Sequence, residues 1–207
     1  MNAARGGEAT TGRSKGVPPG AQGDTPGDGA GAPIPHLRRA ANALTGLRLV
    51  AAPLIAFAVH EGASLFALAL FVLAVVTDLL DGRLARRSGG GSPLGGFLDH
   101  ATDATFVSLG LLAYAAAGSV PLLLPPLIVA AFAQYALDSR ALQGSALRAS
   151  ALGRWTGIAY FVLLGVPVVR DGVGIGWPPD ALVRGLGWAL VATTLLSMAL
   201  RLRSRRA

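Results

Sequence analysis

Four aspartates lie at two helix-like spacings in a short stretch of the 207-residue chain. Asp78 and Asp81 are three residues apart, and Asp99 and Asp103 are four residues apart. Either spacing places both side chains on one face of a helix. Because a loop of Gly, Ser and Pro joins the two pairs, we expect two antiparallel helices. Their carboxylate pairs would then face each other.

Facing carboxylates favour a divalent cation site. Like charges at short distance repel one another, so four ionised groups need a counter-charge. Oxygen-only ligands suit Mg²⁺ or Mn²⁺, and Mg²⁺ usually leaves coordination positions open for substrate phosphates. Two such ions can stabilise the attacking and leaving oxygens of a phosphoryl displacement. The alternative, that these aspartates are only solvated interfacial charges, is less favoured because ionisable groups at membrane depth are costly and usually functional.

The composition predicts that membrane helices position these carboxylates. Hydrophobic residues make up 52% of the chain and charged residues 14%, whereas about a quarter of a soluble domain is charged. Apolar stretches in a bilayer must be helical, because every backbone polar group needs an internal partner. We therefore predict an all-α integral membrane protein with six transmembrane helices, at about Asn42–Val59, Ser64–Leu80, Phe97–Ala117, Pro121–Leu137, Leu152–Val169 and Ala181–Leu200.

The basic residues predict how these helices are oriented. Of 18 Lys and Arg residues, all but Arg170 and Arg184 share one side of the membrane if both termini are cytoplasmic. This predicts a multi-pass protein of the cell (plasma) membrane, with a polar active-site cavity facing the cytoplasm. It also accounts for the net charge of +7 without a nucleic-acid partner. We expect residues 1–35 to be a disordered tail and residues 36–204 to form one membrane domain.

The aspartate-rich stretch resembles the signature of the CDP-alcohol phosphatidyltransferase family. That signature is Asp-x-x-Asp-Gly-x-x-Ala-Arg, eight residues, then Gly-x-x-x-Asp-x-x-x-Asp. Every fixed position is present here, as Asp78, Asp81, Gly82, Ala85, Arg86, Gly95, Asp99 and Asp103. The resemblance implies a bundle of six transmembrane helices that forms a homodimer. It also implies transfer of a substituted phosphate from a CDP-linked donor, such as CDP-diacylglycerol, to an alcohol acceptor, with release of CMP.

The resemblance also implies a role for each aspartate. Asp78 and Asp99 would ligate both of two Mg²⁺ (or Mn²⁺) ions, Asp81 one ion, and Asp103 the other. Asp103 would also be the general base that takes the proton of the acceptor hydroxyl. A carboxylate is a weak base unless its surroundings tune it, and the proposed metals and neighbouring carboxylates would do so.

Other positions of the signature are expected to contact the donor. The small residues Gly82 and Ala85 would let the CDP group approach the helix closely. Arg86 would pair with a donor phosphate, because a guanidinium offers forked donors. Ser92 lies where related phosphatidylinositol phosphate synthases contact the nucleotide.

Upstream, the pattern Asn42-x-x-Thr45-x-x-Arg48 followed by Pro53 resembles the start of the first helix in phosphatidylglycerophosphate and phosphatidylserine synthases. Asn42 and Thr45 would contact substrate or cap the helix, since both residue types are good caps. Arg48 has an alternative interpretation as an ordinary cytoplasmic charge.

The acceptor stays open at this point. Arg140, Arg148 and Arg154 would bind a phosphorylated acceptor, or they would serve membrane topology alone. Glycerol 3-phosphate is the best candidate. Phosphatidylinositol phosphate, phosphatidylserine and cardiolipin synthases of the same family are alternatives, and a membrane cation transporter is an alternative from another class.

Overall fold

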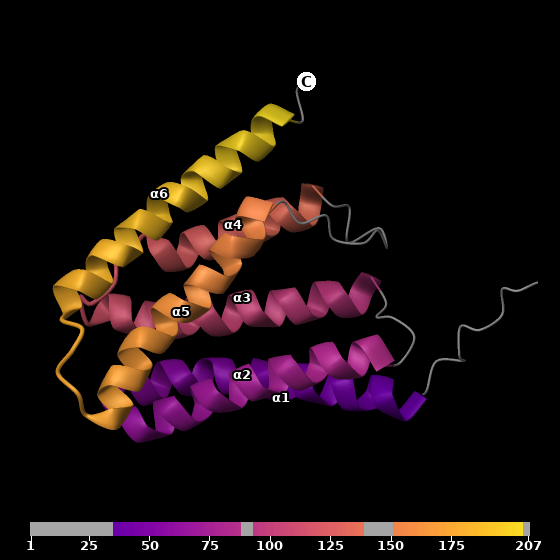
Figure 1. Cartoon of the computed structure of the whole chain (residues 1–207), viewed down its shortest axis with the longest axis horizontal. Coiled ribbons are helices and arrows are strands. Elements are labelled where there is room, and N and C mark those ends of the chain that lie inside the picture. Colours follow the sequence, from indigo (N-terminus) through magenta and orange to yellow (C-terminus); the bar gives the residue numbers. More distant parts are fainter. Residues whose placement is uncertain (1–34, 88–92, 139–150, 205–207) are drawn as a thin grey trace, which may run out of the picture. The chain divides into compact units, whose positions relative to one another are not determined.

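The computed structural model describes the backbone of residues 35–87, 93–138 and 151–204. It also describes their side chains, except those of residues 35–41, 81–82, 84–87, 93, 151–153 and 204. These ranges fold into six helices that run in alternating directions along the chain (Figure 1). The helices are α1 Pro35–His60, α2 Ser64–Arg87, α3 Pro93–Ala116, α4 Leu124–Asp138, α5 Ala151–Val173 and α6 Asp180–Ser204.

The all-helical class and the positions of the six helices agree with the sequence prediction, but several bounds differ. Helix α1 begins seven residues before the predicted Asn42, and α2 continues seven residues beyond the predicted Leu80. In both places polar residues extend a helix past its apolar stretch. Helix α4 begins later than predicted, at Leu124 rather than Pro121, and two prolines follow in its first turn, where a missing N–H costs least.

Three stretches of the described helices are long and apolar enough to cross a membrane: Asn42–His60, Arg154–Val173 and Asp180–Arg203. Two shorter apolar stretches, Ser64–Leu80 and Leu124–Asp138, accompany them. Many large apolar side chains on these helices are exposed, including Phe57, Leu65 and Val162. An exposed apolar surface of this extent suits contact with lipid.

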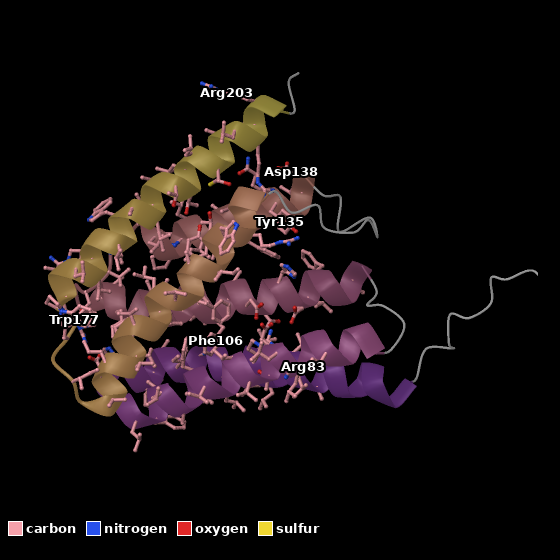
Figure 2. All side chains as sticks on the ribbon, viewed as in Figure 1. Arg83, Phe106, Tyr135, Asp138, Trp177 and Arg203 are labelled. Atoms are coloured by element: carbon pink, nitrogen blue, oxygen red, sulfur yellow. The ribbon has the colours of Figure 1, made fainter. Side chains whose placement is uncertain are left out.

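Helix α1 packs extensively against both α2 and α3, while α2 also contacts α5, and α3 also contacts α4 and α5. The buried face of α1 is built largely from small residues, among them Ala51, Ala52 and Ala58. Small residues let helix backbones approach closely in a membrane. Phe106 of α3 lies among the helices and contributes to the core that these contacts bury (Figure 2).

The short connections α1–α2, α3–α4 and α5–α6 lie at one end of the helices, on the left in Figure 1. Arg170 and Arg184 both lie near this end. Arg170 pairs with Asp171 and Asp180, each at 2.7 Å, and Arg184 donates to the carbonyl oxygen of Gly118. The two basic residues that the charge pattern set apart are therefore held by local partners at one end of the bundle.

Candidate functional site

Three of the four predicted aspartates meet at one point. Asp78 lies on α2, and Asp99 and Asp103 lie one turn apart on α3. Each offers a carboxylate oxygen, and the three oxygens lie within 4.8 Å of one another. All three residues are half-buried. We call Asp78, Asp99 and Asp103 the carboxylate cluster.

An arginine from α1 lies against the carboxylate cluster. Nη1 of Arg48 donates to Oδ1 of Asp99 at 2.9 Å and to Oδ1 of Asp103 at 2.5 Å. Nη2 of the same side chain is 3.6 Å from Oδ1 of Asp78. Arg48 is only 1% exposed, so it is not the ordinary cytoplasmic charge of the alternative interpretation. The helix pair that carries the cluster is thus tied together through α1.

The cluster borders a cavity of about 500 Å³. Asp78 of α2 and Asp103 of α3 line it together with further residues of α3, and α4, α5 and α6 supply the rest of its wall. Apolar side chains such as Val107, Ile128 and Phe161 also face the cavity. A mainly apolar pocket with a few convergent polar groups is the usual form of a ligand site.

Two arginines line the same cavity as the cluster. Arg154 lies at the start of α5 and Arg201 near the end of α6. The guanidinium carbon of Arg201 is 4.9 Å from the ring centre of Tyr135 on α4. Tyr135 also lies beside the imidazole of His100, with 6.4 Å between ring centres (Tyr135 is labelled in Figure 2). This basic and aromatic part of the wall fits an anion.

Buried hydroxyl groups line another part of the cavity wall. Tyr160 on α5 and Thr194 on α6 share a hydrogen bond of 2.5 Å. Thr194 donates its only hydroxyl proton to the carbonyl oxygen of Leu190 at 2.6 Å, so Tyr160 must be the donor to Thr194. Thr156 and Ser197 line the cavity as well. The contact between Tyr160 and Thr194 joins α5 to α6.

The predicted donor-binding and acceptor-binding residues have different outcomes. Arg154 lines the cavity, and its contact with the acceptor stays a prediction. Ser92, Arg140 and Arg148 lie outside the described residues. Asp81, Gly82, Ala85 and Arg86 lie in the last turns of α2, where the structure describes the backbone but not these side chains.

The capping interpretation of Asn42 and Thr45 is wrong. Helix α1 begins at Pro35, so both residues lie inside the helix, where no free N–H groups await a cap. Asn42 is exposed and Thr45 is half-buried, one turn before Arg48. Contact with substrate stays a prediction for both.

Sequence reasoning assigned no site role to Arg48, Arg201 or Tyr135. Basic and aromatic residues near the ends of membrane helices also serve topology and interfacial anchoring, so the residue types alone did not indicate a site role.

The carboxylate cluster fits a divalent cation by its donor chemistry. All three groups are hard oxygen ligands, which suit Mg²⁺ or Mn²⁺. They come from two helices and converge at the border of a cavity, so a substrate phosphate can approach the same ion.

Comparison with known proteins decides the family. The family model described as CDP-alcohol phosphatidyltransferase matches residues 38–199. The chain belongs to the CDP-alcohol phosphatidyltransferase family. This membership favours an enzyme over the cation transporter that intramembrane aspartates alone had left open.

Two kinds of curated relative support the membership. A protein of Mycobacterium tuberculosis named "Probable phosphatidylglycerophosphate synthase" is 37% identical over 87 residues, which cover 39% of this chain and 42% of the relative. A Cereibacter sphaeroides protein named "CDP-diacylglycerol--glycerol-3-phosphate 3-phosphatidyltransferase" is 32% identical over 141 residues, 64% of either chain. Both matches thus span less than two thirds of the relative. No solved structure significantly matches this phosphatidyltransferase family member.

Proposed function

We propose that the protein transfers a phosphatidyl group from CDP-diacylglycerol to glycerol 3-phosphate and releases CMP. One observation carries this proposal: two members of the carboxylate cluster, Asp78 and Asp103, line one cavity together with Arg154 and Arg201. The carboxylates suit cations that hold a pyrophosphate, and the arginines suit a second, separate phosphate. The names of the curated relatives support the same donor and acceptor.

Asp78, Asp99 and Asp103, with Asp81 from the sequence signature, would hold two Mg²⁺ or Mn²⁺ ions. Such ions neutralise charge on the donor pyrophosphate and on the phosphoryl group in transit. The protein's own contribution is to fix the positions of the ligands. Two of the carboxylates lie one turn apart on α3, a spacing that a rigid helix holds constant.

Asp103 would act as the general base. It lines the cavity, so an acceptor hydroxyl can reach its carboxylate. The acceptor oxygen forms a bond to the phosphorus that carries the lipid, and the bond from that phosphorus to the CMP oxygen breaks. The hydroxyl proton passes to Asp103, and CMP leaves with the bonding electron pair. A positioned base of this kind contributes about 10²- to 10⁴-fold to a rate.

Arg154 and Arg201 would hold the phosphate of the acceptor. Arginine binds phosphate through charge-assisted hydrogen bonds that are stronger than neutral ones. Holding the acceptor in this way converts a bimolecular attack into an oriented one. The pair also favours glycerol 3-phosphate or an inositol phosphate over serine, which carries no phosphate. A phosphatidylinositol phosphate synthase is therefore the second candidate.

We further propose that all six helices span the plasma membrane and that the cavity opens to the cytoplasm. The basic residues support this orientation, because Arg154 and Arg201 lie at the end of the helices opposite Arg170 and Arg184. Both termini would then be cytoplasmic. The homodimer that the family resemblance implies stays a prediction.

The decisive experiment is CMP release by the purified protein in detergent with CDP-diacylglycerol and Mg²⁺. The acceptors tested would be glycerol 3-phosphate, inositol 1-phosphate, inositol, serine and phosphatidylglycerol. We expect release with glycerol 3-phosphate, loss of release on adding a chelator, and a phosphatidylglycerophosphate product by mass spectrometry. Release with inositol 1-phosphate instead would establish the second candidate. No release with any acceptor, from folded protein, would contradict both.

A further inference from the structure

We propose that Arg48 is an internal counterion of the carboxylate cluster, which positions the three aspartates in the metal-free protein and competes with divalent cations for them. The proposal rests on the metal-binding role proposed above for these aspartates. It concerns how readily the site takes up its metals rather than which reaction follows.

The contacts of Arg48 show that it neutralises the cluster. One nitrogen, Nη1, lies within hydrogen-bond distance of both Asp99 and Asp103, at 2.9 and 2.5 Å. The other terminal nitrogen is 3.6 Å from Asp78. A guanidinium stays charged in proteins, and a buried charge requires a partner. Arg48 is buried at the meeting point of three helices, so its charge and those of the aspartates compensate one another.

The charge balance leaves room for a divalent cation. One guanidinium carries a single positive charge, whereas the three ionised carboxylates carry three negative charges. Asp78 and Asp103 also face the cavity, so an ion can reach them from there. The cluster therefore still attracts a cation while Arg48 is in place.

The same contacts make Arg48 a competitor. Oδ1 of Asp99 and Oδ1 of Asp103 both accept hydrogen bonds from Arg48, and a metal ion would approach carboxylate oxygens to about 2.1 Å. Two cations crowded onto the same oxygens repel each other. Binding of the ion must therefore weaken at least one contact of Arg48, and whatever stabilises the metal-free arrangement lowers the apparent affinity for metal.

A rival role predicts the opposite sign. If Arg48 kept its hydrogen bonds to the carboxylates while they ligate metal, it would orient the ligands and raise metal affinity. The effect of removing Arg48 on metal affinity thus distinguishes competition from support. If Arg48 only packed the helices together, its removal would change neither the metal affinity nor the dependence of that affinity on the carboxylates.

The test compares Mn²⁺ binding by calorimetry in the purified full-length protein and in Arg48→Gln. We expect Arg48→Gln to bind Mn²⁺ more tightly, by about tenfold in apparent Kd. We also expect it to melt at a lower temperature in chelator and to gain more melting temperature from Mn²⁺ than the parent protein does. Weaker or unchanged Mn²⁺ binding in the variant would overturn the proposal.

Arg170→Gln is the matched control. Arg170 also pairs with two aspartates, Asp171 and Asp180, but it lies at the other end of the bundle. This variant should melt earlier with unchanged Mn²⁺ affinity. Absence of Mn²⁺ binding in the parent protein would contradict the proposed metal role itself, and so would be distinguishable from failure of the present inference.

A second variant covers the case in which Arg48→Gln does not fold. Adding Asp103→Asn removes one of the charges that Arg48 compensates. In chelator, the double variant should therefore be more stable than Arg48→Gln alone. A double variant that is no more stable than Arg48→Gln would also overturn the proposal, because the loss would then not arise from uncompensated carboxylates.

Discussion

The guanidinium of Arg201 on α6 lies over the ring of Tyr135 on α4, with 4.9 Å between the guanidinium carbon and the ring centre. A cation over an aromatic face is held by the ring's quadrupole. The contact helps to orient a positive charge on the wall of the cavity. Under the proposed function, an acceptor phosphate would meet a charge that is already oriented.

Arg201→Gln should weaken binding of the acceptor. We expect the KM for glycerol 3-phosphate to rise about 10- to 100-fold, because a hydrogen bond to a charged group contributes about 1.5–3 kcal/mol. The KM for CDP-diacylglycerol should change little. Arg203→Gln is the control, since Arg203 is exposed and does not line the cavity. Equal effects of the two substitutions on acceptor KM would contradict the assignment.

Asp103→Asn should stop turnover while much of the donor binding remains. We expect kcat to fall by at least about 10²-fold, the usual contribution of a positioned base. Steady-state kinetics and calorimetric binding of the donor would show this. Asp171→Asn is the control, because Asp171 pairs with Arg170 at the other end of the bundle. Near-normal turnover in Asp103→Asn would refute the role as a base.

Gly187→Ala should destabilise the protein. A Cβ at Gly187 would overlap the ring of Pro121, approaching its Cγ to 3.1 Å and its Cδ more closely still. A rigid ring cannot move aside, and overpacking of this kind costs about 1–3 kcal/mol. The melting temperature in detergent measures the effect.

Gly185→Ala is its matched control. Two residues earlier on the same helix, a Cβ at Gly185 would meet nothing within 4 Å. Alanine there should be neutral or stabilising by up to about 1 kcal/mol, from helix propensity. If both variants melted at the same temperature, close contact between α6 and the α3–α4 connection would not limit stability.

Tyr160→Phe should lower stability by about 1 kcal/mol through loss of one hydrogen bond. Tyr160 is the donor in its 2.5 Å contact with Thr194, and Phe keeps the ring while removing that donor. Melting temperatures of Tyr160→Phe, Thr194→Val and the double variant form a cycle that isolates the pair. Strictly additive losses would show that the two hydroxyls do not interact.

Much of the fold follows from local signals in the sequence. Each apolar stretch predicted a helix, and the six helices lie where these stretches do, three of them with stretches long and apolar enough to cross a membrane. The aspartates of α3 are predictable for the same reason, since a spacing of four fixes one helix face whatever surrounds it. The predicted ends of the helices were less accurate, because polar residues continue α1 and α2 beyond their apolar stretches.

Contacts between distant helices could not be predicted in this way. Arg48 and Asp103 are 55 residues apart, and an arginine near the end of an apolar span fits the positive-inside rule equally well whether it faces solvent or a buried carboxylate. The same ambiguity applies to Arg201 beside the basic tail. The packing of α1 against α2 and α3 shows that Arg48 lies inside the bundle, and the lining of the cavity shows where Arg201 lies.

The order of the cavity-lining helices has an evolutionary consequence. The carboxylates and Arg48 all come from residues before the α3–α4 connection, and Arg154, Arg201 and Tyr135 all come after it. Under the roles proposed for these residues, reaction chemistry and headgroup choice would occupy separate, contiguous halves of the gene. A single recombination within the α3–α4 turn would give a daughter enzyme a new alcohol substrate while it inherited the whole phosphoryl-transfer apparatus unchanged.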